Sequence, residues 1–340
     1  MRTRHSTQTS PRGRRRDRRR PRRDRAVSPA LPADTAVRRA RLQHRAARPA
    51  RRPARRRRRA AARLEAAHPG AFAVTQVADA TAADALLKDR SAYAAFVLAS
   101  DGVSLHTASA ASPTVAALLT AAAQQLAPGR PVPITDVAPL PADDPRGTGF
   151  AAGFFPLMIA SLIAAVLLFS LVPRKAARLL GVLLFSAFAG LAGAFILQTW
   201  MGIIGGDMLP VAAVIGLIAL AVSASVLGLA AIIGPAGIGL GAILIMLVGN
   251  ALAGVGGAPE LLPQPWGEVG QWLPIGAGAT ALRSAAWFDF AGADSAMWTL
   301  GAWAVAGILL LALAWLRQPS APSPSTLSPD APAPHAAATT

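Results

Sequence analysis

The sequence predicts an all-α polytopic membrane bundle of five transmembrane helices, joined to a small extracytoplasmic α+β domain. Three observations support this fold class. The second half of the chain holds five long apolar stretches without a charged residue, and the segment before them alternates between helix and strand patterns. In addition, the 340 residues are 53% hydrophobic and only 15% charged, although the formal net charge is +17. Such a composition is unusual for a soluble domain.

Five stretches are long enough to cross about 30 Å of hydrocarbon at about 1.5 Å per residue. Because lipid offers no hydrogen-bond partners to the backbone, each stretch is expected to be helical. Together with their connections they form a predicted transmembrane domain over residues 150–317. The predicted spans are residues 150–172, 179–200, 209–233, 236–256 and 296–316.

The short connections between these spans predict the orientation of the chain. Arg174, Lys175 and Arg178 lie between the first two spans, and Arg317 follows the last span. Lys and Arg in short loops favour the cytoplasmic side. The sequence therefore predicts a multi-pass plasma-membrane protein with a cytoplasmic C-terminus. The region before residue 150 and the loop 257–295 are then extracytoplasmic.

Residues 64–149 carry the pattern of a small α+β domain. Strands are predicted over residues 72–77, 93–100, 103–109 and 131–140, with a turn at Asp101-Gly102. Helices are predicted over residues 80–90 and 112–126, after the end of another near residue 68. Asp79 or Thr81 is expected to cap the first of these two helices, and Ser112 followed by Pro113 the second.

The N-terminal segment 1–63 differs from the rest of the chain. It holds 25 of the 34 Lys and Arg and 3 of the 17 Asp and Glu, so its charge is +22 and that of the remainder is −5. Its basic residues are all arginine, a composition typical of GC-rich DNA read in a shifted frame. We therefore interpret this disordered segment as a frameshift or start-site artefact that has replaced a sixth, N-terminal transmembrane helix. The alternative is a genuine polybasic arm that binds anionic lipid or nucleic acid.

Several classes of chemistry have no support in the sequence. The chain contains no cysteine, and its five histidines are scattered without metal-ligand spacing. Neither Lys88 nor Lys175 follows a glycine-rich phosphate loop. We therefore expect no enzyme activity, no catalytic residue, no cofactor and no metal site. The tail 318–340 is rich in Pro, Ser and Ala and is expected to be disordered.

Three stretches resemble the phage infection protein family (Pip, or YhgE-like), which is related to the permease subunits of type-2 ABC exporters. They are ADDPRGTGFAAGFFPLMIAS (142–161), LLGVLLFSAFAGLAGAFILQTWMGIIGG (179–206) and LPQPWGEVGQWLPIGAGATALRSAAWF (262–288). The resemblance covers residues 60–317 and implies an N-terminal helix, an outer domain and five further helices. It therefore also implies the helix that segment 1–63 lacks, and it implies a role in export while supplying no catalytic residues.

The predicted outer loop holds the residues that we consider first for function. Pro and Gly divide this segment into short turns, Trp rings favour the headgroup region, and residues 279–288 could form a short helix in the outer leaflet. The segment is interpreted either as an outer gate or re-entrant element, or as a structural plug. Its candidate residues are Trp266, Gly267, Gln271, Trp272, Pro274, Gly276, Gly278 and Arg283.

Within the spans, Asn250 is the candidate to line a path, and Gly237 with Gly241 permits close helix packing. No ionisable residue lies in a span, which disfavours ion-coupled transport. The leading hypothesis is a permease-like subunit that depends on a separate ATPase and forms a homo- or heterodimer in the lipid bilayer. The alternatives are a non-transporting surface receptor or scaffold, and lipid or nucleic-acid binding by the arm, of which nucleic acid is the less favoured.

Overall fold

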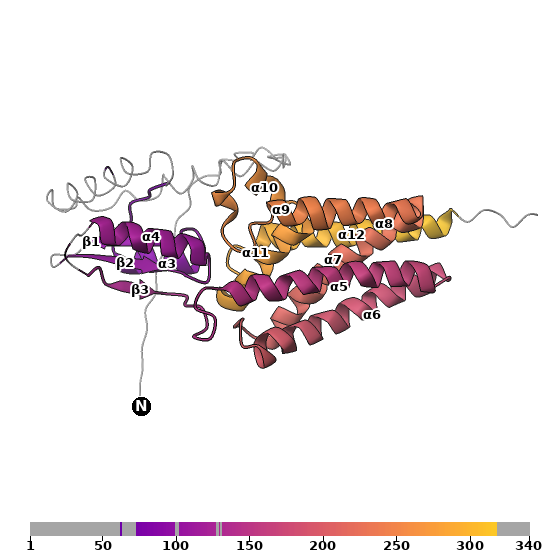
Figure 1. Ribbon diagram of the computed structural model, residues 1–340, viewed down its shortest axis with the longest axis horizontal. Helices are drawn as coiled ribbons and strands as arrows, with labels where there is room; N and C mark the ends of the chain where they lie inside the picture. The colour runs from indigo at the N-terminus through magenta and orange to yellow at the C-terminus, as the bar shows by residue number, and fades with distance from the viewer. Residues whose placement is uncertain (1–61, 63–72, 99–101, 127–128, 130, 318–340) are drawn as a thin grey trace, which may run out of the picture. The chain divides into compact units, whose positions relative to one another are not determined.

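The computed structural model describes residues 62, 73–98, 102–126, 129 and 131–317 (Figure 1). Contacts divide the chain into Met1–Ala54 and Arg55–Thr340, and every described residue belongs to the second unit. The predictions for the tail, for the turn residue Asp101 and for nearly all of segment 1–63 lie outside the described residues.

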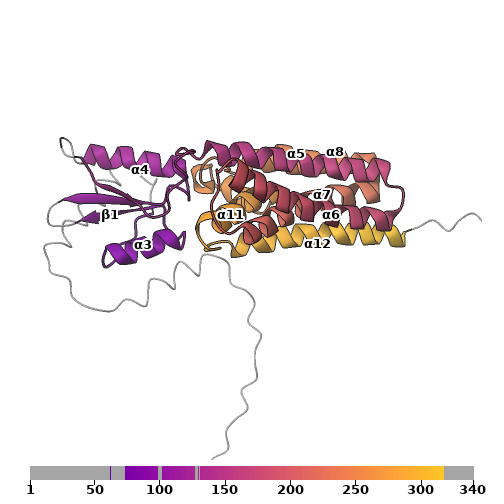
Figure 2. The same ribbon diagram turned by 90° about the horizontal axis from the view of Figure 1, so that it is seen from below.

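In the described part of the chain before the bundle, a three-stranded sheet and two helices form what we call the sheet region. Their order is α3 (Ala80–Lys88), β1 (Ala94–Leu98), β2 (Val103–Thr107), α4 (Pro113–Leu126) and β3 (Ile134–Asp136). The sheet order is β1-β2-β3, with β1 antiparallel and β3 parallel to β2. Parallel strands need a crossover, which α4 supplies between β2 and β3. Figure 2 shows α3 and α4 on opposite sides of the sheet.

The sequence predicted most of these elements, including both helix caps. The Asp79 carboxylate accepts a hydrogen bond of 2.8 Å from the Ala82 amide, and the Ser112 hydroxyl accepts one of 3.3 Å from the Val115 amide. The predicted strand over residues 72–77 is wrong in its described part, because residues 73–77 do not adopt strand conformation and are mostly exposed. Thr75 and Gln76 interrupt the apolar residues Ala73, Val74 and Val77, which leaves little continuous apolar surface to bury against the sheet.

Five helices in the described residues are long and apolar enough to cross a membrane, which confirms the five predicted spans by length and composition. Two of them change to π-helical geometry near their C-terminal ends. Every helix begins and ends within a few residues of the prediction. The spans are α5 (Thr148–Leu171), α6 (Lys175–Ala194) with η1 (Phe195–Trp200), α7 (Met208–Ile233), α8 (Pro235–Ala242) with η2 (Ile243–Gly249) and α9 (Asn250–Leu252), and α12 (Asp294–Leu316).

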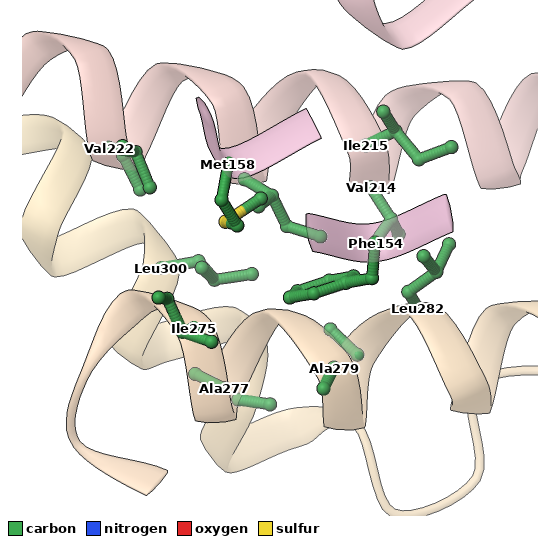
Figure 3. Close-up of a cluster of buried hydrophobic side chains, with 14 of the residues drawn as sticks. Phe154, Met158, Val214, Ile215, Val222, Ile275, Ala277, Ala279, Leu282 and Leu300 are labelled. Carbon is green, nitrogen blue, oxygen red and sulfur yellow. The ribbon is translucent and has the colours of Figure 1, made fainter. Parts of the chain in front are cut away.

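Helix α7 forms the centre of the bundle. Of its 26 residues 15 are buried, whereas α5 buries 6 of 24. Glycine allows its neighbours to come close, since a Cβ on Gly228 would clash with the Gly307 backbone of α12. Figure 3 shows Phe154 and Met158 of α5 directed into the same cluster as Val214, Ile215 and Val222 of α7.

The outer helices expose large apolar side chains. Phe188 on α6 and Leu309 on α12 are 70% and 61% exposed. In water such a surface would be an unusual exposed apolar patch, whereas lipid chains cover it without cost. Together with the five apolar helices, this surface indicates a membrane protein.

Three short helices follow α9 and precede α12. They are η3 (Pro259–Leu261), α10 (Trp266–Gln271) and α11 (Pro274–Trp287). Of the 14 residues of α11, 12 are buried. The segment that the sequence predicted as an outer loop therefore contains an enclosed helix.

Candidate functional site

Helix α11 is the element around which the predicted site residues gather. Its 14 residues reach about 21 Å, which is too short to cross the hydrocarbon layer. Ile275, Ala279 and Leu282 point into the cluster shared with α5 and α7 (Figure 3). Nearly all of the helix is therefore enclosed by protein.

The predicted glycines and Pro274 lie where backbones approach closely. Pro274 occupies the first helical position of α11, where its missing N–H leaves no bond unmade. A Cβ on Gly276 would clash with the Gly270 carbonyl, and one on Gly267 with the Pro259 carbonyl. A Cβ on Gly278 would press against Phe154 and Ile218. These residues allow α10 and α11 to fold against each other and against the bundle.

The polar and aromatic candidates divide into buried and exposed groups. Trp266 and Trp272 are 54% and 69% exposed. Gln271 is partly buried, where its amide donates to the Ala253 carbonyl and its oxygen accepts a 2.7 Å bond from the Thr280 hydroxyl. Gln271 therefore connects α10 to α11, while the two indole rings face outward.

Arg283 is the most deeply buried charged side chain among the described residues, at 5% exposure. Its guanidinium donates a 2.9 Å hydrogen bond to the Val255 carbonyl and lies 4.5 Å from the centre of the Phe150 ring. Burial, together with the positive charge of Arg90, lowers the pKa of Arg283 to about 10. The side chain therefore stays charged at neutral pH and connects α11, the start of α5 and the loop after α9.

A second arginine reaches the same helix from the sheet region. Arg90, which follows α3, donates a 3.1 Å hydrogen bond to the Thr280 carbonyl and another to the Ser284 hydroxyl. Its guanidinium lies 5.4 Å from the centre of the Phe288 ring. The side chain is partly buried, and burial lowers the pKa of Arg90.

Tyr93 makes a further polar contact across this boundary. Its hydroxyl donates a 2.7 Å hydrogen bond to a carboxylate oxygen of Glu260 in η3. Burial, and then the negative charge of Glu260, raises the pKa of Tyr93, so the phenol remains a donor at neutral pH.

The sheet region completes its two hydrophobic clusters with residues from the segment after α9. Phe288, only 5% exposed, packs with Leu87 of α3 and with four alanines of the sheet region. Ala258 packs with Leu105 of β2 and with apolar residues of α4. Since both clusters include residues more than 100 positions away, the sheet region and the 253–293 segment share their cores.

The remaining predicted candidates lie elsewhere. Gly237 and Gly241 of α8 lie against α7, where a Cβ on Gly237 would clash with the Leu229 backbone. Asn250 is exposed at the start of α9. It borders a shallow hollow of about 390 Å³ whose other lining residues are Ala251, Gly254, Val255, Gly256, Gly257, Ala258, Leu261 and Leu262. None of these three residues touches the Arg90 or Arg283 contacts.

Four residues of this site were missed at the sequence level: Arg90, Tyr93, Ser284 and Phe288. Their partners lie 167 to 194 positions away for Tyr93 and Arg90, so no local spacing reveals them. Within the described ranges, no three His, Asp or Glu side chains lie close enough to hold a metal ion.

Comparison with protein-family models, with curated proteins and with solved structures finds no match to the chain. What the site does must therefore be argued from its own residues. Chemically, the arrangement fixes a short helix between the helical bundle and the three-stranded sheet.

Proposed function

We propose that the chain is a permease-like subunit of an export system, with the sheet region on the extracytoplasmic side and a separate ATPase as its source of energy. The observation that carries this proposal is a short, enclosed helix, α11, packed between the bundle and the sheet region. A protein that only anchors a domain needs a single span. Four spans around the central span α7, with an extramembrane domain connected to them through α11, favour a function within the membrane.

Charge asymmetry supports the orientation. Lys175 donates a hydrogen bond to the Ala314 carbonyl, so the start of α6 and the end of α12 lie at the same end of the bundle. Arg174, Arg178 and Arg317 belong to that end, whereas the acids Glu260, Glu268, Asp289 and Asp294 belong to the segment around α11. This separation favours a cytoplasmic basic end.

The order of elements supports the export class, since it resembles that of the phage infection protein family related to type-2 ABC exporters. Because α7 fills the centre of one bundle with buried side chains, we propose that the path lies between two copies. The receptor or scaffold alternative requires no such path.

Purification of the full chain in mild detergent tests the export class. We expect a nucleotide-hydrolysing subunit to co-purify in a fixed ratio, with ATPase activity that depends on this chain. If the chain is repeatedly purified alone from cells that express it at native levels, the export class is contradicted and the receptor or scaffold function is favoured.

Labelling of single cysteines tests the orientation, which is simple because the chain has no cysteine of its own. Ala85 on α3 and Ala176 near the start of α6 are both exposed. We expect a membrane-impermeant maleimide to label Ala85→Cys on intact cells and Ala176→Cys only after lysis. The opposite pattern would invert the proposed topology.

A further inference from the structure

Unusual backbone conformations occur where the sheet region contacts the C-terminal end of α11. Among the described residues, only Arg90, Asp289 and Phe290 combine a side chain with a positive φ, at 57°, 46° and 67°. Left-handed backbone is unfavourable for residues with a Cβ and is retained where surrounding contacts impose it. Here all three residues lie at one contact, with Arg90 on one side and the turn after α11 on the other.

Hydrogen bonds of Arg90 and Ser284 hold this contact together. The Arg90 guanidinium donates to the Thr280 carbonyl and the Ser284 hydroxyl. That hydroxyl donates a 2.8 Å bond to the Ala291 carbonyl, and the Phe290 amide donates to the Ser284 carbonyl. One guanidinium therefore fixes both the last turns of α11 and the strained turn that follows. In this partly buried site, such charge-assisted bonds are stronger than on an open surface.

Apolar packing connects the same contact both to the sheet region and to the helical bundle. At its C-terminal side, α11 leads into Phe288, which fills a cluster of the sheet region beside Leu87. On its other side, Ile275 and Leu282 belong to the cluster of the bundle (Figure 3). Helix α11 is thus packed against the bundle, and the residue that follows it is part of a cluster of the sheet region.

We propose that the Arg90–Ser284 contact is a conformational latch through which the sheet region sets the position of α11 against α7. With the latch closed, α11 is held among the side chains of the bundle. With the latch open, the turn at 288–292 relaxes and α11 becomes free to shift. A partner that binds the sheet region would act on the bundle by this route. The latch does not depend on the export proposal, since it concerns only the coupling of two regions.

Hydrogen exchange of the full chain in lipid nanodiscs tests the latch. We expect Arg90→Ala to speed amide exchange in α11 by about tenfold or more, while α7 exchanges as before. Lys88→Ala is the matched control, because it removes an exposed cation two residues away on α3. It should leave the exchange of α11 unchanged.

A covalent replacement of the latch separates coupling from simple loss of stability. A Cβ at Gly292 would lie 3.4 Å from the Arg90 Cβ, close to the separation in a disulfide. In the double variant Arg90→Cys/Gly292→Cys, we expect oxidation to restore slow exchange in α11 and reduction to remove it. Gly292 has a φ of +67°, so the single variant Gly292→Cys serves as the control for backbone strain.

Three results would overturn the latch. In the first, Arg90→Ala and Lys88→Ala give the same exchange in α11. In the second, Arg90→Ala speeds exchange equally in α7 and α11, which would make the contact a general part of folding. In the third, the oxidised double variant exchanges as fast as the reduced one.

Discussion

Helices α7 and α11 are both enclosed by protein, but they are enclosed by different means. Helix α7 buries apolar and small side chains against four other spans. Helix α11 is also lined by small residues, yet it carries Thr280, Arg283 and Ser284, each of which makes a side-chain hydrogen bond. The difference teaches that the centre of the bundle depends on close packing, whereas its end beside the sheet region depends on a set of polar contacts.

The packing of α7 can be broken at a glycine, and this should have the largest effect. In Gly307→Leu the new side chain would clash with the Ala224 and Ser225 backbone of α7. We expect a loss of about 3 kcal/mol or more in stability, measured as the melting temperature of the purified chain in detergent. Gly301→Leu lies on the same helix in open space and should be neutral. Equal losses in the two variants would contradict close packing as the cause.

The polar contacts of α11 can be broken at Arg283. Arg283→Ala removes the bond to the partly buried Val255 carbonyl and the contact with the Phe150 ring. We expect a loss of about 2–3 kcal/mol, measured in the same thermal assay. Arg146→Ala, at an exposed arginine, should lose less than about 0.5 kcal/mol. A neutral Arg283→Ala would show that packing alone holds α11.

Polar contacts also hold the start of α5, which lies at the end of the bundle beside the sheet region. Buried Asp144 accepts bonds of 2.9 Å and 3.1 Å from the Thr148 amide and hydroxyl, and one of 2.8 Å from the Gly149 amide. We expect Asp144→Ala to cost about 2 kcal/mol in thermal unfolding, because a helix N-terminus loses its cap. Asp143→Ala changes an exposed neighbour and should be neutral. If the two variants melt together, the carboxylate does not act as a cap.

The smallest expected effect concerns Tyr93 and its dependence on pH. Tyr93→Phe removes the 2.7 Å hydrogen bond to Glu260 and should cost about 1 kcal/mol at neutral pH. The raised pKa means that, above the ordinary value of 10.0, the unfolded chain loses the phenol proton before the folded chain does. This contribution to stability is thus fully present below pH 10.0 and is lost as the pH rises further. Between pH 8 and 11, the melting temperature should fall less steeply with rising pH in Tyr93→Phe than in the unmodified chain. Identical slopes in the two proteins would exclude this role of Tyr93.

Local signals in the sequence predicted much of the fold. The absence of charge over whole stretches predicted the five spans, and the Asp79 and Ser112 caps marked the two helices of the sheet region. Of the candidate site, Arg283, Gln271 and the glycines of α10 and α11 were recognised from their crowding between Pro and Trp. Arg90 and Phe288 were not, because each is an ordinary residue whose role depends on a partner far along the chain.

The sequence by itself determined which segments are apolar helices, because length and hydrophobicity are properties of a single segment. Only the tertiary structure decided that α7 is central, since the other spans are similarly apolar but mostly face outward. It also decided that α11 is enclosed and that Phe288 and Ala258 complete the clusters of the sheet region. The physical reason is that burial and hydrogen-bond partnership belong to pairs of residues brought together by folding, and no local pattern encodes them.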